Sequence, residues 1–127
     1  GLYQVLSQNL AEEIRRQLNI SVTLDRSTQG SLDNLKLLRS QKVDFALYQP
    51  GTEWILQPSH GSDETVQAAF ITNLYPEVAH WFVRRDAGIE SPADLVGKKV
   101  AVGNETAGDY AMSRLLLEHL GLTEDDI

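Results

Sequence analysis

Residues 91–112 constrain the fold more than any other part of the chain. The run Ser91-Pro-Ala-Asp94 has the order of a capped helix start, with proline at the first helical position and an acid three residues after the serine. Val100-Ala-Val-Gly103 then predicts a short buried strand and a turn. Thr106 and Asp109 repeat the capping spacing, so a second helix is expected to begin there. Its first N–H groups and its dipole would favour a carboxylate or phosphate by roughly 1 kcal/mol.

Helix and strand patterns alternate along the rest of the chain. Leucine and isoleucine recur every four residues in 3–18, and Leu32, Leu35 and Leu38 follow Ser31, which is the expected cap of a second helix. A turn with a short helix is expected over 49–54 and a polar loop over 57–67. Strands are expected over 20–24, 43–47, 68–74, 79–83 and 100–102. This order predicts an α/β protein with a parallel or mixed sheet covered by helices.

The candidate site lies where these strands end. Ligands of open α/β sheets bind at the carboxyl ends of the strands, and polar residues follow four of the expected strands. They are Ser27 to Ser31, Tyr48 and Gln49, Tyr75 to Glu77, and Asn104 to Gly108. Taken singly, the hydroxyl residues also suit helix capping and Tyr75 suits ring packing. Only the coincidence of their positions favours ligand binding.

The amino-acid composition argues against several classes of binding partner and of catalytic or metal-binding chemistry. The 127 residues carry a net charge of −7, which disfavours nucleic acid and anionic lipid surfaces. The absence of cysteine excludes thiol catalysis, disulfides and thiolate zinc sites. The three histidines, His60, His80 and His119, lack a second ligand at metal spacing, so neither a metal nor another cofactor is expected. No apolar run approaches the ~18 residues of a membrane span.

Several short motifs, in order and nearly end to end, resemble the TAXI family, the solute receptors of tripartite TRAP transporters. The two most specific are Ser27-Thr-Gln-Gly-Ser31 and Leu74-Tyr-Pro-Glu77. The others are Gly1-Leu-Tyr3, Asn34-Leu-Lys-Leu-Leu-Arg39, Asp44-Phe-Ala-Leu47, Gln49, Val83-Arg-Arg-Asp86, Gly88-Ile89, Asp94-Leu95, Gly97-Lys98, Val100-Ala-Val-Gly103 and Gly121-Leu-Thr-Glu-Asp-Asp-Ile127.

The resemblance implies a type II periplasmic-binding-protein fold, like the ligand-binding core of glutamate receptors. Each lobe of this fold has three α/β/α layers. Residues 1–84 would form most of lobe one without its first strand, and residues 85–127 the crossover and the beginning of lobe two. We therefore expect an incomplete two-lobe chain, either a fragment of a longer protein or a shortened relative that self-associates through sheet edges.

The resemblance also implies a function and its residues. The expected protein is a secreted periplasmic or extracellular receptor, not an enzyme, which closes over a small anionic solute such as glutamate or glutamine and delivers it to a membrane permease. A ligand-sensing ectodomain of a signalling protein or channel is the alternative. The ligand-binding positions carried over from the family are Gly1, Tyr3, Thr28, Gln29, Ser31, Gln49, Tyr75, Thr106, Ala107 and Gly108. Many relatives have aspartate after the position of Gln49, where this chain has Pro50-Gly51-Thr52. The family's ligand contact at that aspartate is therefore not carried over to this chain.

Overall fold

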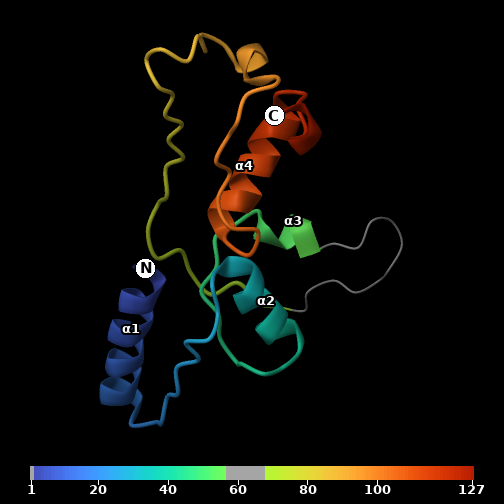
Figure 1. Cartoon of the computed structure of the whole chain (residues 1–127). Helices are drawn as coiled ribbons and strands as arrows, with labels where there is room; N and C mark the ends of the chain where they lie inside the picture. The colour runs from blue at the N-terminus through green and yellow to red at the C-terminus, as the bar shows by residue number, and fades with distance from the viewer. Residues whose placement is uncertain (1, 57–67) are drawn as a thin grey trace.

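The structure is a computed structural model that describes residues 2–56 and 68–127 (Figure 1). Helices are its regular elements within these ranges. They are α1 (Leu2–Leu18), α2 (Ser31–Arg39), α3 (Thr52–Leu56), the 3-10 helix η1 (Pro92–Leu95), α4 (Gly108–His119) and the 3-10 helix η2 (Glu124–Asp126). Gly1 and the loop expected over 57–67 lie outside the described residues.

The predicted helices are confirmed, and their sequences account for them. α1 carries its apolar side chains at a spacing of four and pairs Glu13 with Arg16 at 2.5 Å on its exposed side. η1 begins at the predicted Ser91 cap, where the Asp94 carboxylate accepts hydrogen bonds from the Ser91 N–H at 2.8 Å and the Glu90 N–H at 3.0 Å. These backbone bonds, led by the one from Glu90, hold the pKa of Asp94 below its usual range.

The core joins α2, α3 and α4, which follow one another in space, with α3 in contact with both of the others (Figure 1). α2 contributes Leu32 and Leu35, and α4 contributes Ala111 and Leu117, all of them buried. A side chain at Gly51, in the turn before α3, would meet Leu115 and Met112 of α4. Through this packing the start of α2 and the start of α4 belong to the same hydrophobic core.

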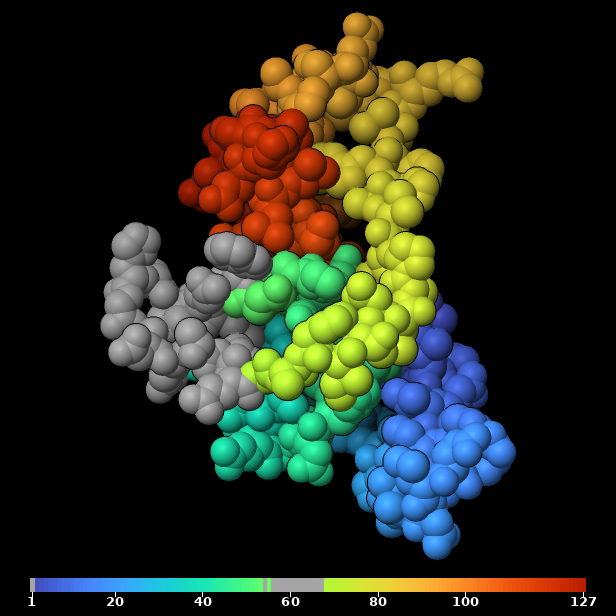
Figure 2. Space-filling view, turned by 180° about the vertical axis from the view of Figure 1, so that it is seen from behind, coloured from blue at the N-terminus to red at the C-terminus, as the bar shows by residue number. Residues whose placement is uncertain are grey.

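The segments predicted as strands are not paired with one another. The described residues contain no β-strand, and residues 68–86 run as a long open stretch that lies along the surface (Figures 1 and 2). Large apolar side chains of this stretch face solvent, including Phe70 at 71% and Phe82 at 90% exposure. A strand exists only when a neighbour completes its hydrogen bonds, and no described segment serves as that neighbour. The expected sheet therefore stays a prediction.

The solvent-accessible area of the chain is large for its mass. The accessible area is 9901 Å², whereas a compact protein of this mass exposes about 6,700 Å². The chain therefore exposes more surface than a compact protein of the same mass.

Candidate functional site

The candidate site is centred where the start of α2 meets the loop before α4. Gly30 precedes α2, and a Cβ atom at this position would lie 2.6 Å from the Thr106 carbonyl oxygen and 2.7 Å from Ala107 Cα. The Leu32 N–H donates to that same Thr106 oxygen at 2.9 Å. Only a residue without a side chain allows this approach, so the glycine fixes two predicted site segments against each other.

Gln49 links the two helix starts. Its N–H donates to the Ser31 hydroxyl at 3.0 Å, and Ser31 is 1% exposed. Its side chain lies against the first residue of α4, because a Cβ atom at Gly108 would be 2.5 Å from Gln49 Cβ. The structure thus brings Ser31, Gln49 and Gly108 together, as expected for one site.

Two tyrosines and a carboxylate extend this cluster. The Tyr75 hydroxyl donates to Glu77 Oε1 at 2.6 Å, and Tyr3 lies near the Ser31 and Tyr75 side chains, which act on its pKa. Burial, followed by the Glu77 carboxylate, raises the pKa of Tyr75. Burial is also the main cause that raises the pKa of Tyr3, against the opposing bond with Ser31. Both phenols therefore stay protonated at neutral pH and can donate hydrogen bonds.

Thr28 and Gln29 stand at the edge of the cluster. Gln29 Oε1 accepts a long bond of 3.4 Å from the Asn104 side chain, and the Gln29 N–H donates to Asp33 at 3.1 Å. The half-buried Thr28 makes no hydrogen bond with any described residue. Its hydroxyl is therefore available to a ligand.

The N–H groups of residues 106–109 were predicted to be available to a ligand, and two of the four donate hydrogen bonds within the protein. The Thr106 N–H donates to Asn104 Oδ1 at 2.9 Å and the Ala107 N–H to the Asn104 carbonyl at 2.8 Å. Within the described ranges, the Gly108 and Asp109 N–H groups have no partner. The prediction that all four N–H groups lack a partner was wrong, because the side chain and the carbonyl group of Asn104 accept hydrogen bonds from the first two.

Two predicted helix caps are also corrected. α4 begins at Gly108 after Ala107, so Thr106 and Asp109 do not form a capping box. α2 begins at Ser31 itself, preceded by Gly30. Ser31 is therefore inside the helix, and its hydroxyl accepts the Gln49 N–H instead of a helix amide.

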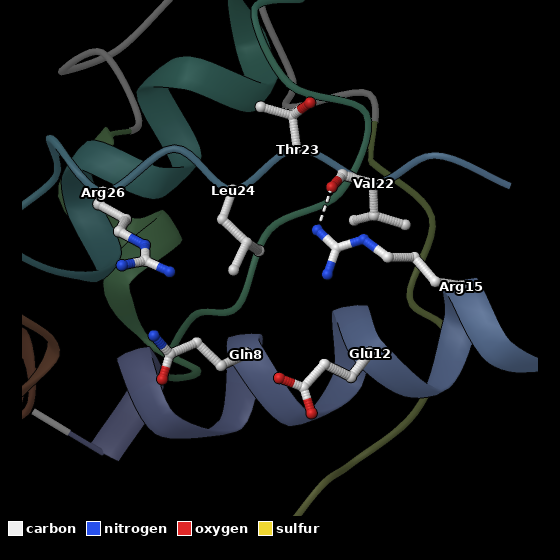
Figure 3. Close-up of a pocket in the computed structure, with 7 residues that line it drawn as sticks. All are labelled: Gln8, Glu12, Arg15, Val22, Thr23, Leu24 and Arg26. Atoms are coloured by element: carbon white, nitrogen blue, oxygen red, sulfur yellow. Dashed lines mark hydrogen bonds between the residues drawn. The ribbon is translucent and has the colours of Figure 1, made fainter.

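Sequence reasoning missed two hollows in the surface. One, of about 550 Å³, lies between α1 and the segment after it and is drawn in Figure 3. Arg15 reaches across it to the Val22 carbonyl. Its lining consists of Gln8, Glu12, Arg15, Val22, Thr23, Leu24 and Arg26. None of the predicted ligand-binding residues lines this hollow, and no motif in the sequence signals it.

The second hollow, of about 850 Å³, adjoins the start of α4. It is bounded by residues 80–84, 98–103 and Asp109, among others. A side chain at Gly103 would lie 2.8 Å from the Asp109 carboxylate, which lines this hollow and accepts a hydrogen bond from the Tyr110 N–H at 3.1 Å. The negative charge of Asp109 therefore disfavours an anion at this side of α4.

Across residues 2–56 and 68–127, no group of three or more histidine, aspartate or glutamate side chains is placed to hold a metal ion. In the same ranges, none of the helices has the length and apolar character needed to cross a bilayer.

Replacing Gly108 by alanine tests the contact between α4 and Gln49. The new Cβ would overlap Gln49 Cβ and Oε1, so we expect the free energy of unfolding to fall by about 1–3 kcal/mol. Urea denaturation measures this loss. In the Gly108→Ala/Gln49→Gly double variant the clash disappears, and the two effects should be strongly non-additive. Additive losses would mean that the two residues do not touch.

No solved structure matches the chain. The sequence matches the NMT1-like family over residues 1–127, which is the whole of its length. The chain therefore belongs to the NMT1-like family, a family of the periplasmic-binding type, and this membership indicates a solute-binding protein.

Proposed function

We propose that this protein is the extracytoplasmic receptor of a TRAP-type transporter of the TAXI group. It binds a small anionic solute such as glutamate or glutamine and hands it to a membrane permease without chemical change. Membership of a solute-binding family supports the general role. The motifs Ser27-Thr-Gln-Gly-Ser31 and Leu74-Tyr-Pro-Glu77 support the narrower assignment.

The proposed fold is a type II lobe in which the apolar segments are strands. Residues 1–84 belong to lobe one and residues 85–127 to the crossover and lobe two. The solvent-facing side chains of Phe70, Ile71, Val78 and Phe82 support this fold, because a sheet would bury them. In such a fold the solute lies between the lobes, where clefts commonly form.

The observation that carries the proposal is the convergence of five separate chain segments. Gly30 lies against Thr106 and Ala107, Gln49 lies against Gly108, and Tyr3 lies near Tyr75 and Ser31. The N–H groups of Gly108 and Asp109, which have no partner among residues 2–56 and 68–127, are available at this point for a carboxylate. In this role Gly108 supplies a backbone amide, while Thr28, Gln29 and Gln49 supply side-chain polar groups.

Titration calorimetry with a panel of amino acids and dicarboxylic acids tests the proposal. We expect micromolar binding of at least one of them. Thr28→Ala should weaken that binding about fivefold to tenfold, because alanine lacks the hydroxyl group that would form a hydrogen bond with the solute. Ser21→Ala, which removes an exposed hydroxyl from the connection after α1, is the matched control and should bind as the unchanged protein does. Absence of heat with every compound would overturn the assignment.

A further inference from the structure

Residues 78–83 form an open segment whose backbone groups have no partner. Within the described part of the chain, none of their N–H or carbonyl groups takes part in a hydrogen bond. The segment lies along the surface (Figures 1 and 2), and its large apolar residues Val78, Trp81, Phe82 and Val83 are all exposed. A row of unpaired backbone groups beside apolar side chains is a template for a strand of another chain.

A glutamate and an arginine flank this segment. Glu77 precedes it and Arg85 follows it, and both are exposed. Neither forms an ion pair with a described residue, whereas Arg84 already pairs with Asp86 at 3.5 Å. Glu77 accepts a hydrogen bond from the neutral Tyr75 hydroxyl at 2.6 Å, which leaves its negative charge uncompensated. The two ends of the segment therefore carry opposite charges that are free to pair.

Two copies of the segment, running antiparallel, bring these charges together. A pair of strands centred on Trp81 sets Glu77 opposite Arg85 of the partner subunit, and symmetry repeats this pair at the other end. The same register sets His80 opposite Phe82 of the partner subunit. Within one chain these two rings already stack, with their centroids 6.1 Å apart. Opposite charges and aromatic rings directly across from each other are pairs that stabilise antiparallel strands.

The exposed apolar surface is large enough for a dimer of moderate affinity. Val78, Trp81, Phe82 and Val83 together expose on the order of 400 Å² in each copy. Pairing would also cover backbone atoms and the stems of the flanking charged side chains, so the interface approaches the total of about 1,200 Å² at which specific interfaces begin. The second copy would supply the strand neighbour that the described residues do not provide.

We propose that this surface is an interface between two copies of the chain, in which residues 77–85 pair antiparallel about Trp81 and Glu77 forms an ion pair with Arg85 of the partner subunit. This inference goes beyond the proposed receptor function and does not depend on it. Each copy carries a net charge of −7, so general repulsion opposes association. The attraction between the copies is therefore local, and charge substitutions can isolate it.

Sedimentation of the purified protein over a range of micromolar concentrations tests the interface. We expect a dimer with a dissociation constant of about micromolar size. Glu77→Lys should weaken it at least about tenfold, although this change lowers the net negative charge, and Arg85→Glu should weaken it as well. The double variant Glu77→Lys/Arg85→Glu should recover most of the affinity, because both ion pairs return in reversed order. Glu118→Lys, on the exposed side of α4, makes the same change in net charge as Glu77→Lys and is the matched control. It should dimerise at least as well as the unchanged protein.

An introduced cysteine tests the register, because the chain has none of its own. In Trp81→Cys the two thiols would lie directly opposite each other, with Cα atoms about 5 Å apart, so mild oxidation should give a disulfide-linked dimer. In Val83→Cys the two positions would be separated by about 13 Å along the strands, which is too far for a disulfide.

The outcomes that overturn the inference are distinct from a failure of the receptor function. A monomer at every concentration overturns the interface and leaves solute binding untouched. A dimer that Glu77→Lys weakens no more than Glu118→Lys does, or that the double variant fails to restore, overturns it too. If a charge variant does not fold, as judged by circular dichroism, Phe82→Lys decides the question. Phe82 is almost wholly exposed, so this change leaves the monomer intact and should abolish the dimer; a dimer that persists would contradict the proposal.

Discussion

Gly30→Ala is expected to lower the free energy of unfolding by about 3 kcal/mol or more, because the added methyl group would overlap backbone atoms of the loop before α4. Its Cβ would lie 2.6 Å from the Thr106 oxygen and 2.7 Å from Ala107 Cα. Both atoms belong to the main chain, so no change of rotamer relieves the overlap. The loop would have to withdraw from α2, and the bond from the Leu32 N–H to Thr106 would be lost with it. Urea denaturation measures the change.

Gly88→Ala is the control for this substitution. Gly88 has a φ of +63°, and a Cβ atom there has no neighbour within 4 Å. Alanine at this position costs roughly 1–2 kcal/mol, from backbone strain alone. The Gly30 variant should therefore be clearly less stable than the Gly88 variant, although the Gly30 backbone is in an extended conformation that any residue can adopt. Equal losses in the two variants would mean that the loop and α2 do not meet as described.

The helices could be predicted from the sequence because their signals are local. The period of four in α1 and the Ser91 to Asp94 cap depend only on residues within a few positions of one another. The start of α4 was misplaced because the decisive residue, Asn104, satisfies the amides of Thr106 and Ala107 before any helix begins. Thr106 and Asp109 have the capping spacing, but a competing turn occupies the same N–H groups.

The convergence of the site residues was predicted from the expected sheet, whereas the structure shows it through helices and loops. Gly30 meets Ala107, and Gln49 meets Gly108, without a paired strand among the described residues. Strand pairing depends on partners far away in sequence. The apolar pattern of 68–74 therefore predicts only that this segment tends to form a β-strand, and not which segment pairs with it.

Leu117→Ala is expected to lower the free energy of unfolding by about 2–5 kcal/mol, the usual range when a fully buried leucine is truncated. Leu117 is 1% exposed and is the largest of the fully buried side chains. Alanine favours helix at least as well as leucine does, so the loss would come from packing and the cavity left behind. The Leu117 carbonyl accepts the Leu122 N–H at 2.8 Å, a backbone bond that the substitution retains.

Leu18→Ala removes the same atoms from a leucine that is 64% exposed at the end of α1, and it should change the free energy of unfolding by no more than about 0.5 kcal/mol. Urea denaturation of the two variants, with unchanged slopes, would show that the difference lies in the stability of the folded state. Similar midpoints would mean that α4 is not packed into the core through Leu117. Because domains are stable by only about 5–15 kcal/mol, a loss of this size would remove a large part of the free energy of unfolding.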